Sequence, residues 1–261
     1  MPIITLITDY GTRDAYVGAL KGVILSLAPK AMLVDVTHDI EPYRIAHGAF
    51  VLRQIWPWFP QGTIHLAVVD PGVGSERRIL LGQYEGQSVI APDNGLLTFL
   101  HRDLPTESMR VVEERRFFLP AVSSTFHGRD IMAPVAAHLA NGVKPREFGH
   151  LTDRLELLPM SYRAELVAET IRGDVLYVDR FGTLVTNVRQ EQLKAPRVHQ
   201  RDWEVTVNDE SLGRICSSFH EVAPGRPVAF VGGSGFLEIG LNQGRAVDRF
   251  GPPEAVRVEV R

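Results

Sequence analysis

An aspartate, a pair of arginines and a histidine are the residues of this chain whose types and surroundings could do chemistry. Asp70 ends a short apolar run and opens a Pro-Gly turn, and Arg77 and Arg78 follow on the same loop. His127 stands in a separate segment, STFHGRD, just ahead of an apolar stretch with helical spacing. A carboxylate and an imidazole can accept a proton, and a guanidinium can orient them. The alternatives are a turn-capping aspartate, surface arginines and a surface loop histidine.

Polar side chains also follow the two apolar runs nearest the N-terminus. Asp9 comes directly after the first run, residues 3–8, and a Thr-His-Asp segment follows the second, residues 32–36. If these runs and the run before Asp70 are adjacent parallel strands, their carboxyl ends meet at one edge of a sheet. Open α/β sheets bind their ligands at that edge. For Asp9, capping of the helix that follows is the alternative.

The elements that must position these residues alternate between strand and helix patterns. Short apolar runs predict strands, and apolar residues three and four apart predict helices. The predicted order is strand 3–8, helix 15–27, strand 32–36, helix 45–55, strand 64–69, a hairpin of strands 79–83 and 88–91, a short helix from 96 to 101, strand 109–112 and helix 131–139. This alternation predicts a mainly parallel sheet with right-handed crossovers. His127 would then lie just before a helix N-terminus, where the helix dipole disfavours a charged imidazole.

The pattern changes in the second half of the chain. It loosens over residues 151–162, the predicted linker, and beyond them the apolar period falls from 3.6 to 2. The predicted strands are 166–171, 174–178, 184–188, 203–207, 227–231, 237–241 and 255–260. Short strands separated by Gly, Asn and Pro turns are typical of a small all-β barrel or sandwich. The sequence therefore predicts an α/β domain at residues 1–158 and a C-terminal β-barrel-like domain at residues 159–261.

Composition narrows the class of protein. A formal net charge of −3 and a pI near 6.3 give no electrostatic footprint for nucleic acid. The single cysteine, Cys216, excludes an internal disulfide and a multi-cysteine zinc site, and there is no His-x-x-x-His pair. No stretch approaches the roughly 20 apolar residues of a membrane helix, and Asp9 comes too early for a signal peptide. We expect a cytoplasmic protein that binds no metal, nucleic acid or membrane.

Seven segments, in order along almost the whole chain, carry a resemblance to a known family. They are TDYGTRDAYVG, THDIEP, VVDPGVGSERR, APDNGLLT, STFHGRD, DRFGTLVTN and GGSGFLEIGLNQG. Together they resemble the S-adenosyl-L-methionine hydroxide adenosyltransferases, relatives of the fluorinase and chlorinase that make 5′-halo-5′-deoxyadenosine. The resemblance implies an α/β domain followed by a β-barrel. It also implies a homotrimer whose active sites lie between the N-terminal domain of one subunit and the C-terminal domain of its neighbour.

The resemblance assigns roles to residues in both halves of the chain. An Asp-Arg-His catalytic triad falls on Asp70, Arg77 and His127, and the family spacing selects Arg77 over Arg78. The implied substrate-binding residues are Asp9 at the ribose hydroxyls, Tyr43 as an aromatic near the ribose, Asp179 at the methionine ammonium, Ser234 near the methionine carboxylate, and Phe181 and Asn187 at the adenine. S-adenosyl-L-methionine would be the substrate, so no cofactor and no metal are expected.

At its centre the sequence departs from the halogenase pattern. Where the fluorinase has a Tyr-Pro pair and a halide-binding serine, this chain has Asp70-Pro71 and His127-Gly128. A carboxylate there would repel a halide and suit a polarised water. The resemblance therefore implies hydrolysis to adenosine and L-methionine by attack of water or hydroxide at the ribose 5′ carbon. A chloride-using adenosyltransferase and a non-catalytic protein that binds adenosine or S-adenosyl-L-methionine are the alternatives.

Overall fold

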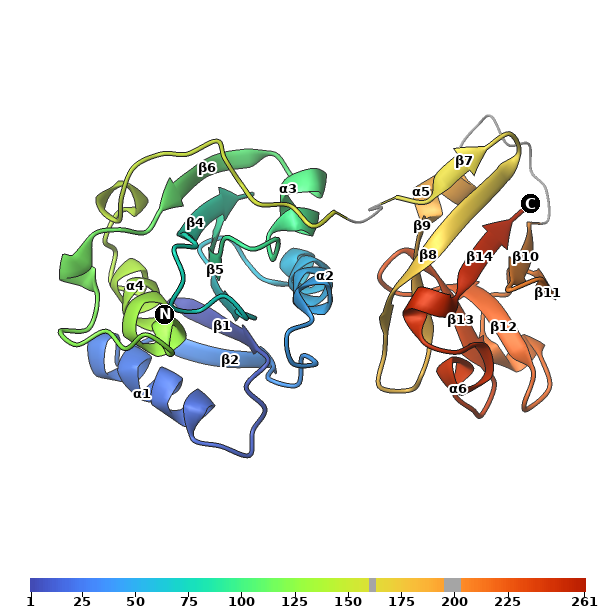
Figure 1. Cartoon of the computed structure of the whole chain (residues 1–261), viewed down its shortest axis with the longest axis horizontal. Helices are drawn as coiled ribbons and strands as arrows, with labels where there is room; N and C mark the ends of the chain where they lie inside the picture. Colours follow the sequence, from blue (N-terminus) through green and yellow to red (C-terminus); the bar gives the residue numbers. More distant parts are fainter. Residues whose placement is uncertain (160–162, 195–202) are drawn as a thin grey trace. The chain divides into compact units, whose positions relative to one another are not determined.

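The computed structural model describes residues 1–159, 163–194 and 203–261 (Figure 1). The chain divides into two compact units, Met1–Leu158 and Pro159–Arg261, each with its own hydrophobic core. The first is an α/β unit with a mostly parallel sheet, and the second is an antiparallel, nearly closed barrel, so the predicted fold class is confirmed. Residues 160–162 of the predicted linker lie outside the described residues.

The N-terminal unit is built on a six-stranded sheet. Its strands are β1 (Ile3–Thr8), β2 (Met32–Thr37), β3 (Ile64–Val68), β4 (Ile79–Tyr84), β5 (Gln87–Pro92) and β6 (Thr106–Val111). Their spatial order is β2-β1-β3-β5-β4-β6. The pairs β1–β2, β1–β3 and β3–β5 are parallel, whereas β4 is antiparallel to both β5 and β6. The predicted parallel core and the predicted hairpin are both present.

Helices cover the two faces of this sheet. They are α1 (Tyr16–Leu27), α2 (Ile45–Ile55), α3 (Thr98–Asp103) and α4 (Ala133–Ala140), with short 3-10 turns at Trp56–Trp58, Arg115–Phe117 and Pro145–Glu147. α1 and α4 lie on one face, and α2 and α3 lie together on the other (Figure 1). Val17, Leu20 and Ile24 of α1 recur every three or four residues and are buried, which is why this segment forms an amphipathic helix.

The carboxyl ends of β1, β2 and β3 meet at one edge of the sheet, as predicted. Thr8, the last residue of β1, pairs with Val68, the last residue of β3, and β2 ends beside them at Thr37. Asp9 and Asp70 therefore leave the sheet at the same edge. The parallel register, set by buried apolar strands, is what brings these distant parts of the chain together.

The C-terminal unit is an antiparallel barrel. Its strands are β7 (Glu165–Val167), β8 (Thr170–Val178), β9 (Leu184–Arg189), β10 (Glu204–Val207), β11 (Glu210–Arg214), β12 (Pro227–Val231), β13 (Phe236–Leu241) and β14 (Arg257–Val260). Its short helices are α5 (Gln190–Leu193) and α6 (Ala246–Phe250), and 3-10 turns lie at Phe219–Glu221 and Pro253–Ala255. The order is β11-β10-β14-β8-β9-β13-β12, with β7 beside β8. A bridge between Cys216 and Phe230 brings the two ends of this order together, so the barrel nearly closes.

The barrel differs from the sequence prediction at β7 and β11, and its short helices α5 and α6 were not predicted. The run 166–171, predicted as one strand, is a hairpin that turns at Ala168, whose φ is +55°. The turn falls at Ala168-Glu169, where no Gly, Asn or Pro signals it. β11 was not predicted, because its residues are mostly polar. The signal that could have found it is the Asn208-Asp209 pair before it, where both residues have positive φ and join β10 to β11.

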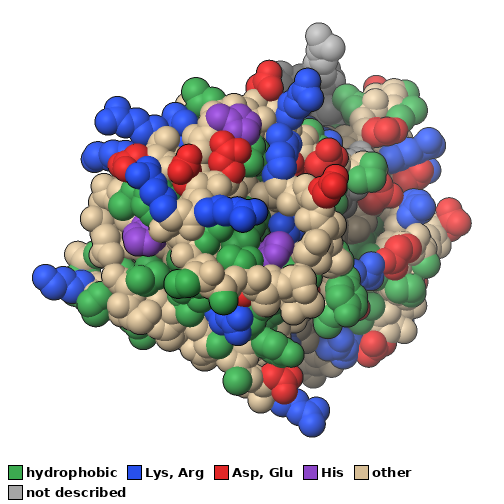
Figure 2. All heavy atoms as spheres, turned by 60° about the vertical axis from the view of Figure 1, so that its left-hand side comes forward, with side chains coloured by type: hydrophobic (Ala, Val, Ile, Leu, Met, Phe, Trp, Pro, Cys, Tyr) green, Lys and Arg blue, Asp and Glu red, His purple; other side chains and the backbone are tan. Residues whose placement is uncertain are grey.

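The surface carries charges of both signs. On the face seen in Figure 2, Lys and Arg side chains are interspersed with Asp and Glu side chains rather than gathered into one basic patch. Such a mixed surface does not attract a polyanion strongly. Within the described part of the chain, no helix has the length and apolar character that crossing a membrane requires.

Candidate active site

Asp70 and Arg77 form a buried ion pair just past the end of β3. Arg77 Nε donates to Asp70 Oδ1 at 2.7 Å and Nη2 donates to Oδ2, so the guanidinium binds the carboxylate through two hydrogen bonds. The Asp70 side chain is 5% exposed and that of Arg77 is 9% exposed. In the loop that joins the two residues, Val73 N–H donates to the Asp70 carbonyl at 3.2 Å and Ser75 N–H donates to the Gly72 carbonyl at 3.1 Å. These two tight turns fold the loop back and bring the side chains into contact.

His127 joins this pair from a second loop. Arg77 Nη2 donates to His127 Nδ1 at 3.1 Å. Because Nδ1 accepts this N–H, we assign the neutral tautomer with the proton on Nε2. His127 directly precedes a π-helical turn, Gly128–Met132, that leads into α4, and such turns are frequent at functional sites. Asp70, Arg77 and His127 thus form one hydrogen-bonded cluster.

The surroundings of His127 favour its neutral form. Burial lowers the pKa of this imidazole from its ordinary value of 6.5, and the positive charge of Arg77 lowers it further, while Asp70 and Asp130 act in the opposite direction. The direction agrees with the prediction from the sequence. The causes differ, because burial and Arg77 lower the pKa, whereas the sequence had pointed to the helix dipole.

We expect the pKa of His127 to lie below that of an ordinary histidine. Arg77→Gln should raise this pKa, because the change removes a neighbouring positive charge. Asp70→Asn should lower it, because the carboxylate favours the imidazolium. ¹⁵N NMR titration of the histidine side chains, with His127→Asn to assign the signal, measures these shifts. An Arg77→Gln protein with an unchanged His127 pKa would show that Arg77 does not control this imidazole.

Gly74 lets the two loops of the cluster approach each other. Its φ is +82°, and a Cβ at this position would lie 2.3 Å from the carbonyl oxygen of Ser124. Ser124 lies in the loop before His127, so this is a contact of backbone with backbone that no side-chain rotation could relieve. The two loops are therefore in contact independently of the charged side chains.

Arg78, the neighbour of Arg77, has different partners. Its Nε and Nη2 donate to Asp93 Oδ2 at 2.9 and 2.5 Å. Nη1 donates to Thr152 Oγ1 at 3.2 Å, and Nη2 also donates to the carbonyl of Arg154 at 2.9 Å. Arg78 thus holds residues 152–154, near the end of the N-terminal unit, in place. Among the described contacts, Arg77 bonds Asp70 and Arg78 does not.

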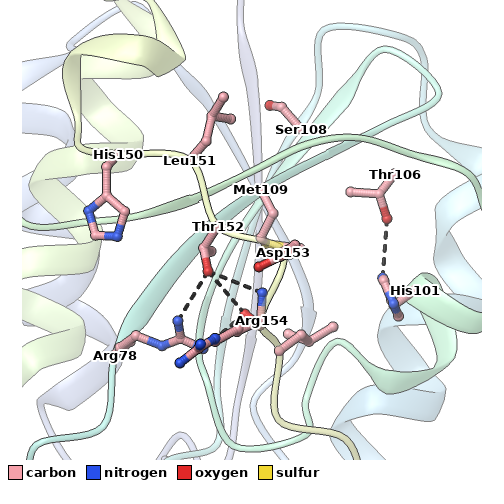
Figure 3. A pocket seen from close by; sticks show the side chains of 11 residues that line it. Arg78, His101, Thr106, Ser108, Met109, His150, Leu151, Thr152, Asp153 and Arg154 are labelled. Carbon is pink, nitrogen blue, oxygen red and sulfur yellow. Dashed lines mark hydrogen bonds between the residues drawn. The ribbon is translucent and has the colours of Figure 1, made fainter.

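A cavity of about 790 Å³ lies beside Arg78, between β6 and residues 150–155 (Figure 3). Several of its polar groups are hydrogen-bonded to one another. Arg78 bonds Thr152, and His101 Nδ1 lies 3.2 Å from Thr106 Oγ1. Asp70, Arg77 and His127 are not among the described residues that line this cavity. We therefore place the candidate active site at the cluster and not in this cavity.

Asp9 lies at the same edge of the sheet as the cluster. Its Oδ2 accepts a hydrogen bond from the backbone N–H of Tyr43 at 3.3 Å. Burial raises the pKa of the Asp9 carboxyl, the backbone hydrogen bonds oppose this rise, and the charge of Asp70 adds to it. The Tyr43 side chain is 73% exposed and its φ is +69°, so the loop presents the ring to solvent.

Tyr10 was not predicted as a site residue, yet it borders the cluster. Its ring centroid lies 5.9 Å from that of Tyr16 and 5.7 Å from that of Phe126. A Cβ at Gly128, next to His127, would lie 2.4 Å from the Tyr10 hydroxyl oxygen. Burial and the charges of Asp9 and Asp70 raise the pKa of this phenol well above its ordinary value. The sequence offers no signal for this contact, since it joins residues far apart in the chain.

In the C-terminal unit, Asp179 and Phe181 line a cavity of about 480 Å³ together with Glu238. Asp179 Oδ1 accepts from the Thr183 N–H at 2.8 Å, and the Phe181 side chain is 77% exposed. Glu238 is a further residue that the prediction missed. Burial and the charge of Asp179 raise the pKa of its carboxyl. Its place on β13 inside the motif FLEIGL, a charged residue in an apolar strand, is the signal that could have found it.

The other two predicted residues of this unit occupy different positions. Ser234 Oγ donates to Glu238 Oε1 at 3.4 Å, which places it beside the same carboxylate. Asn187 is fully buried, and its Oδ1 accepts from the backbone N–H of Asp174 at 2.9 Å. Asn187 is not among the described residues that line the cavity. The structure therefore groups Asp179, Phe181 and Ser234 around Glu238, and places Asn187 within the barrel wall.

The cluster in the N-terminal unit can polarise a water molecule and take its proton. A carboxylate and a neutral imidazole are proton-accepting or hydrogen-bonding groups, and the guanidinium between them fixes both. Over the described residues, no three His, Cys, Asp or Glu side chains gather as a metal site would need.

Comparison with known proteins covers both units. Residues 4–149 match the SAM hydroxide adenosyltransferase N-terminal domain, and residues 173–259 match the corresponding C-terminal domain. An (R)-S-adenosyl-L-methionine hydrolase from Thermus thermophilus is 35% identical over 97% of this chain and 97% of the relative. A fluorinase from Actinopolyspora mzabensis is 25% identical over 99% of this chain and 97% of the relative.

A solved structure agrees with the fold as well. The crystal structure of an uncharacterized conserved protein from Thermotoga maritima has a TM-score of 0.90 and 34% sequence identity, and it covers 98% of this chain and 99% of its own. Both units of this chain thus match one family in sequence, in the order found from the motifs. The chain belongs to the S-adenosyl-L-methionine hydroxide adenosyltransferase family of enzymes.

Proposed function

We propose that the protein hydrolyses S-adenosyl-L-methionine to adenosine and L-methionine. The observation that carries this proposal is the hydrogen-bonded cluster of Asp70, Arg77 and His127 in a chain of this family. The full-length relative at 35% identity is named as a hydrolase of the same substrate. The Asp70 carboxylate in this cluster disfavours a halide and suits a water molecule.

The reaction is a substitution at the ribose 5′ carbon. The oxygen of a bound water forms a bond to C5′, and the C5′–S electron pair passes to the sulfonium sulfur, which becomes the neutral thioether of methionine. The water loses one proton to the protein and, from there, to solvent. The sulfonium already carries the positive charge that makes it a leaving group, so the protein has to orient and deprotonate the water.

The hydrogen bonds divide this work between two residues. Because His127 Nδ1 accepts from Arg77, Nε2–H is the imidazole group left for a ligand, and it can only donate. We assign His127 to orient the water by donating to its oxygen. Asp70 takes the proton through a lone pair that Arg77 leaves open, and Arg77 holds the two side chains in place. Protonation of His127 would break its bond with Arg77, so turnover should fall in acid.

We propose that Asp9 binds the ribose hydroxyls, with Tyr43 nearby, and that Asp179 binds the methionine ammonium. Ser234 would lie near the methionine carboxylate, and Phe181 would cover the adenine. Asn187 would serve the adenine site from within the barrel, where its amide oxygen holds the backbone of Asp174. The support is the family match over residues 4–149 and 173–259 and, for Asp179, the carboxylate of Glu238 beside it, since two carboxylates suit a cation.

We further propose a homotrimer in which each active site takes these residues from two subunits. A mixture of Asp70→Asn and Asp179→Ala proteins, refolded or exchanged together, should then regain activity that neither has alone. In trimers formed at random from an equal mixture, about one quarter of the sites combine a wild-type N-terminal unit with a wild-type C-terminal unit of the neighbouring subunit. Mass photometry measures the oligomeric state, and activity per subunit in the mixture tests whether two subunits share each site. Absence of any regained activity in mixed trimers would place both residues of a site in the same subunit.

The reaction is tested by one turnover mixture in ¹⁸O-water with excess chloride, read by mass spectrometry. We expect ¹⁸O in the 5′ hydroxyl of adenosine and none in methionine. Both sulfur epimers of the substrate should be assayed, because the relative's name specifies the (R) form. A 5′-chloro nucleoside as the main product would instead identify a chloride-using adenosyltransferase. Tight binding of adenosine or S-adenosyl-L-methionine with no product would identify a non-catalytic binding protein.

A further inference from the structure

A chain of hydrogen bonds reaches the loop that carries Asp9. Thr8 Oγ1 and His38 Nδ1 lie 2.8 Å apart, and both residues are buried. On the other side of the imidazole, His38 Nε2 lies 3.0 Å from Asp35 Oδ1, and Asp35 Oδ2 accepts from Lys21 Nζ at 2.6 Å. A carboxylate needs a donor, so we assign the His38 proton to Nε2. Nδ1 then accepts from the Thr8 hydroxyl.

His38 contacts the loop on both sides of Asp9. Through its side chain it orients the Thr8 hydroxyl, whose oxygen accepts from the Tyr10 N–H at 3.3 Å. Through its backbone, the His38 carbonyl accepts from the Gly11 N–H at 2.7 Å. The peptide that carries Asp9 is therefore held at both ends by one residue of the neighbouring strand end.

We propose that His38 is a positioning residue for the substrate ribose. It acts through Thr8 and Gly11 to hold the Asp9 carboxylate where it accepts hydrogen bonds from the ribose hydroxyls. This inference rests on the proposed function, because it takes Asp9 as the ribose ligand. His38 is 5% exposed and both of its ring nitrogens have protein partners, so its effect reaches the substrate through other residues.

β1 contains a matched pair that lacks this connection. Thr5 Oγ1 lies 2.7 Å from His65 Nδ1, and His65 Nε2 lies 2.9 Å from Gln87 Oε1. Thr5 and Thr8 are both fully buried in the same strand. Thr5, however, lies inside the sheet, and its hydroxyl contacts no described backbone group of the Asp9 loop. Both threonine hydroxyls therefore bond a buried histidine, but only that of Thr8 also contacts the loop that carries Asp9.

The test compares Thr8→Val with Thr5→Val, which remove the same hydroxyl from the same strand. Both should lower the Tm. Thr8→Val alone should raise the KM for S-adenosyl-L-methionine and the Kd for adenosine, each by about tenfold, with kcat little changed. Thr8→Ser should restore both values. Asp9→Ala should raise both by at least as much as Thr8→Val.

His38 itself is tested by a conservative rescue. His38→Ala should raise the adenosine Kd as Thr8→Val does. His38→Asn places an amide oxygen near the position of Nδ1, where it can accept from Thr8, and should keep the Kd close to that of the wild type.

Equal KM and Kd for the Thr8→Val and Thr5→Val proteins would overturn the inference, as would a fall in kcat without a change in adenosine Kd. A wild-type protein that forms no adenosine would overturn the proposed function instead. Calorimetric titration with adenosine does not depend on turnover. It therefore tests the positioning role whichever reaction the wild type performs.

Discussion

Asp70→Asn should lower kcat by about two to four orders of magnitude, the usual worth of a proton-transfer group. The amide keeps the size of the side chain and can still accept from Arg77. It cannot take a proton from the attacking water, however, and it leaves a buried guanidinium without its counter-charge. His127→Ala should have an effect in the same range. Neither residue is assigned to hold the substrate. Calorimetry with these slow variants should therefore still show S-adenosyl-L-methionine binding, while steady-state kinetics shows the loss of kcat.

Asp93→Asn is the matched control for this experiment. Asp93 forms the same kind of ion pair with Arg78, and its side chain is 3% exposed, but it lies outside the charged cluster. The change should lower the Tm and leave kcat near that of the wild type. If Asp93→Asn reduced kcat as much as Asp70→Asn, both losses would be structural and Asp70 would have no catalytic role.

Gly74→Ala should reduce kcat by about a hundredfold, the scale of a displacement near 1 Å at a reacting group. The new methyl group would meet the Ser124 carbonyl at 2.3 Å, so one of the two loops must move. Arg77 and His127 lie on opposite sides of this contact, and their 3.1 Å hydrogen bond should lengthen as the loops separate. Kinetics, together with the NMR titration of His127, should show a loss of activity and a His127 pKa that rises as Arg77 withdraws.

Gly142→Ala separates this effect from backbone strain. Gly142 has a similar left-handed φ of +91°, but a Cβ there would meet no described atom within 4 Å. It should cost about 1 kcal/mol of stability for the left-handed conformation and leave kcat unchanged. A Gly74→Ala protein with the kinetics of Gly142→Ala would show that the approach of the two loops is irrelevant to catalysis.

Local signals explain why much of the fold could be predicted. β1 and β3 are mostly apolar and almost fully buried, and an aspartate follows each of them within two residues. α1 has its apolar residues at helical spacing. These features depend on residues near one another in sequence, so Asp9 and Asp70 could be placed at one edge of a parallel sheet before any contact was known.

The contacts within the site could not be predicted in the same way. Arg77 and His127 are 50 residues apart, and their bond depends on how closely two loops approach. Nor does local sequence distinguish Arg77 from Arg78; the family resemblance selected Arg77. Adjacent side chains in an extended segment point in opposite directions, and the structure shows one directed to Asp70 and the other to Asp93.

The place of β1 between β2 and β3 sets the order in which the site can be completed during synthesis. β1 is made first but lies between β2 and β3, so Asp9 reaches its final surroundings only after Val68 has left the ribosome. His127 follows with α4. At roughly 5–20 residues per second, the ribosome needs roughly 6 to 24 s to pass from Asp9 to His127. Until then the Asp70–Arg77 ion pair lacks the imidazole that joins it from the second loop.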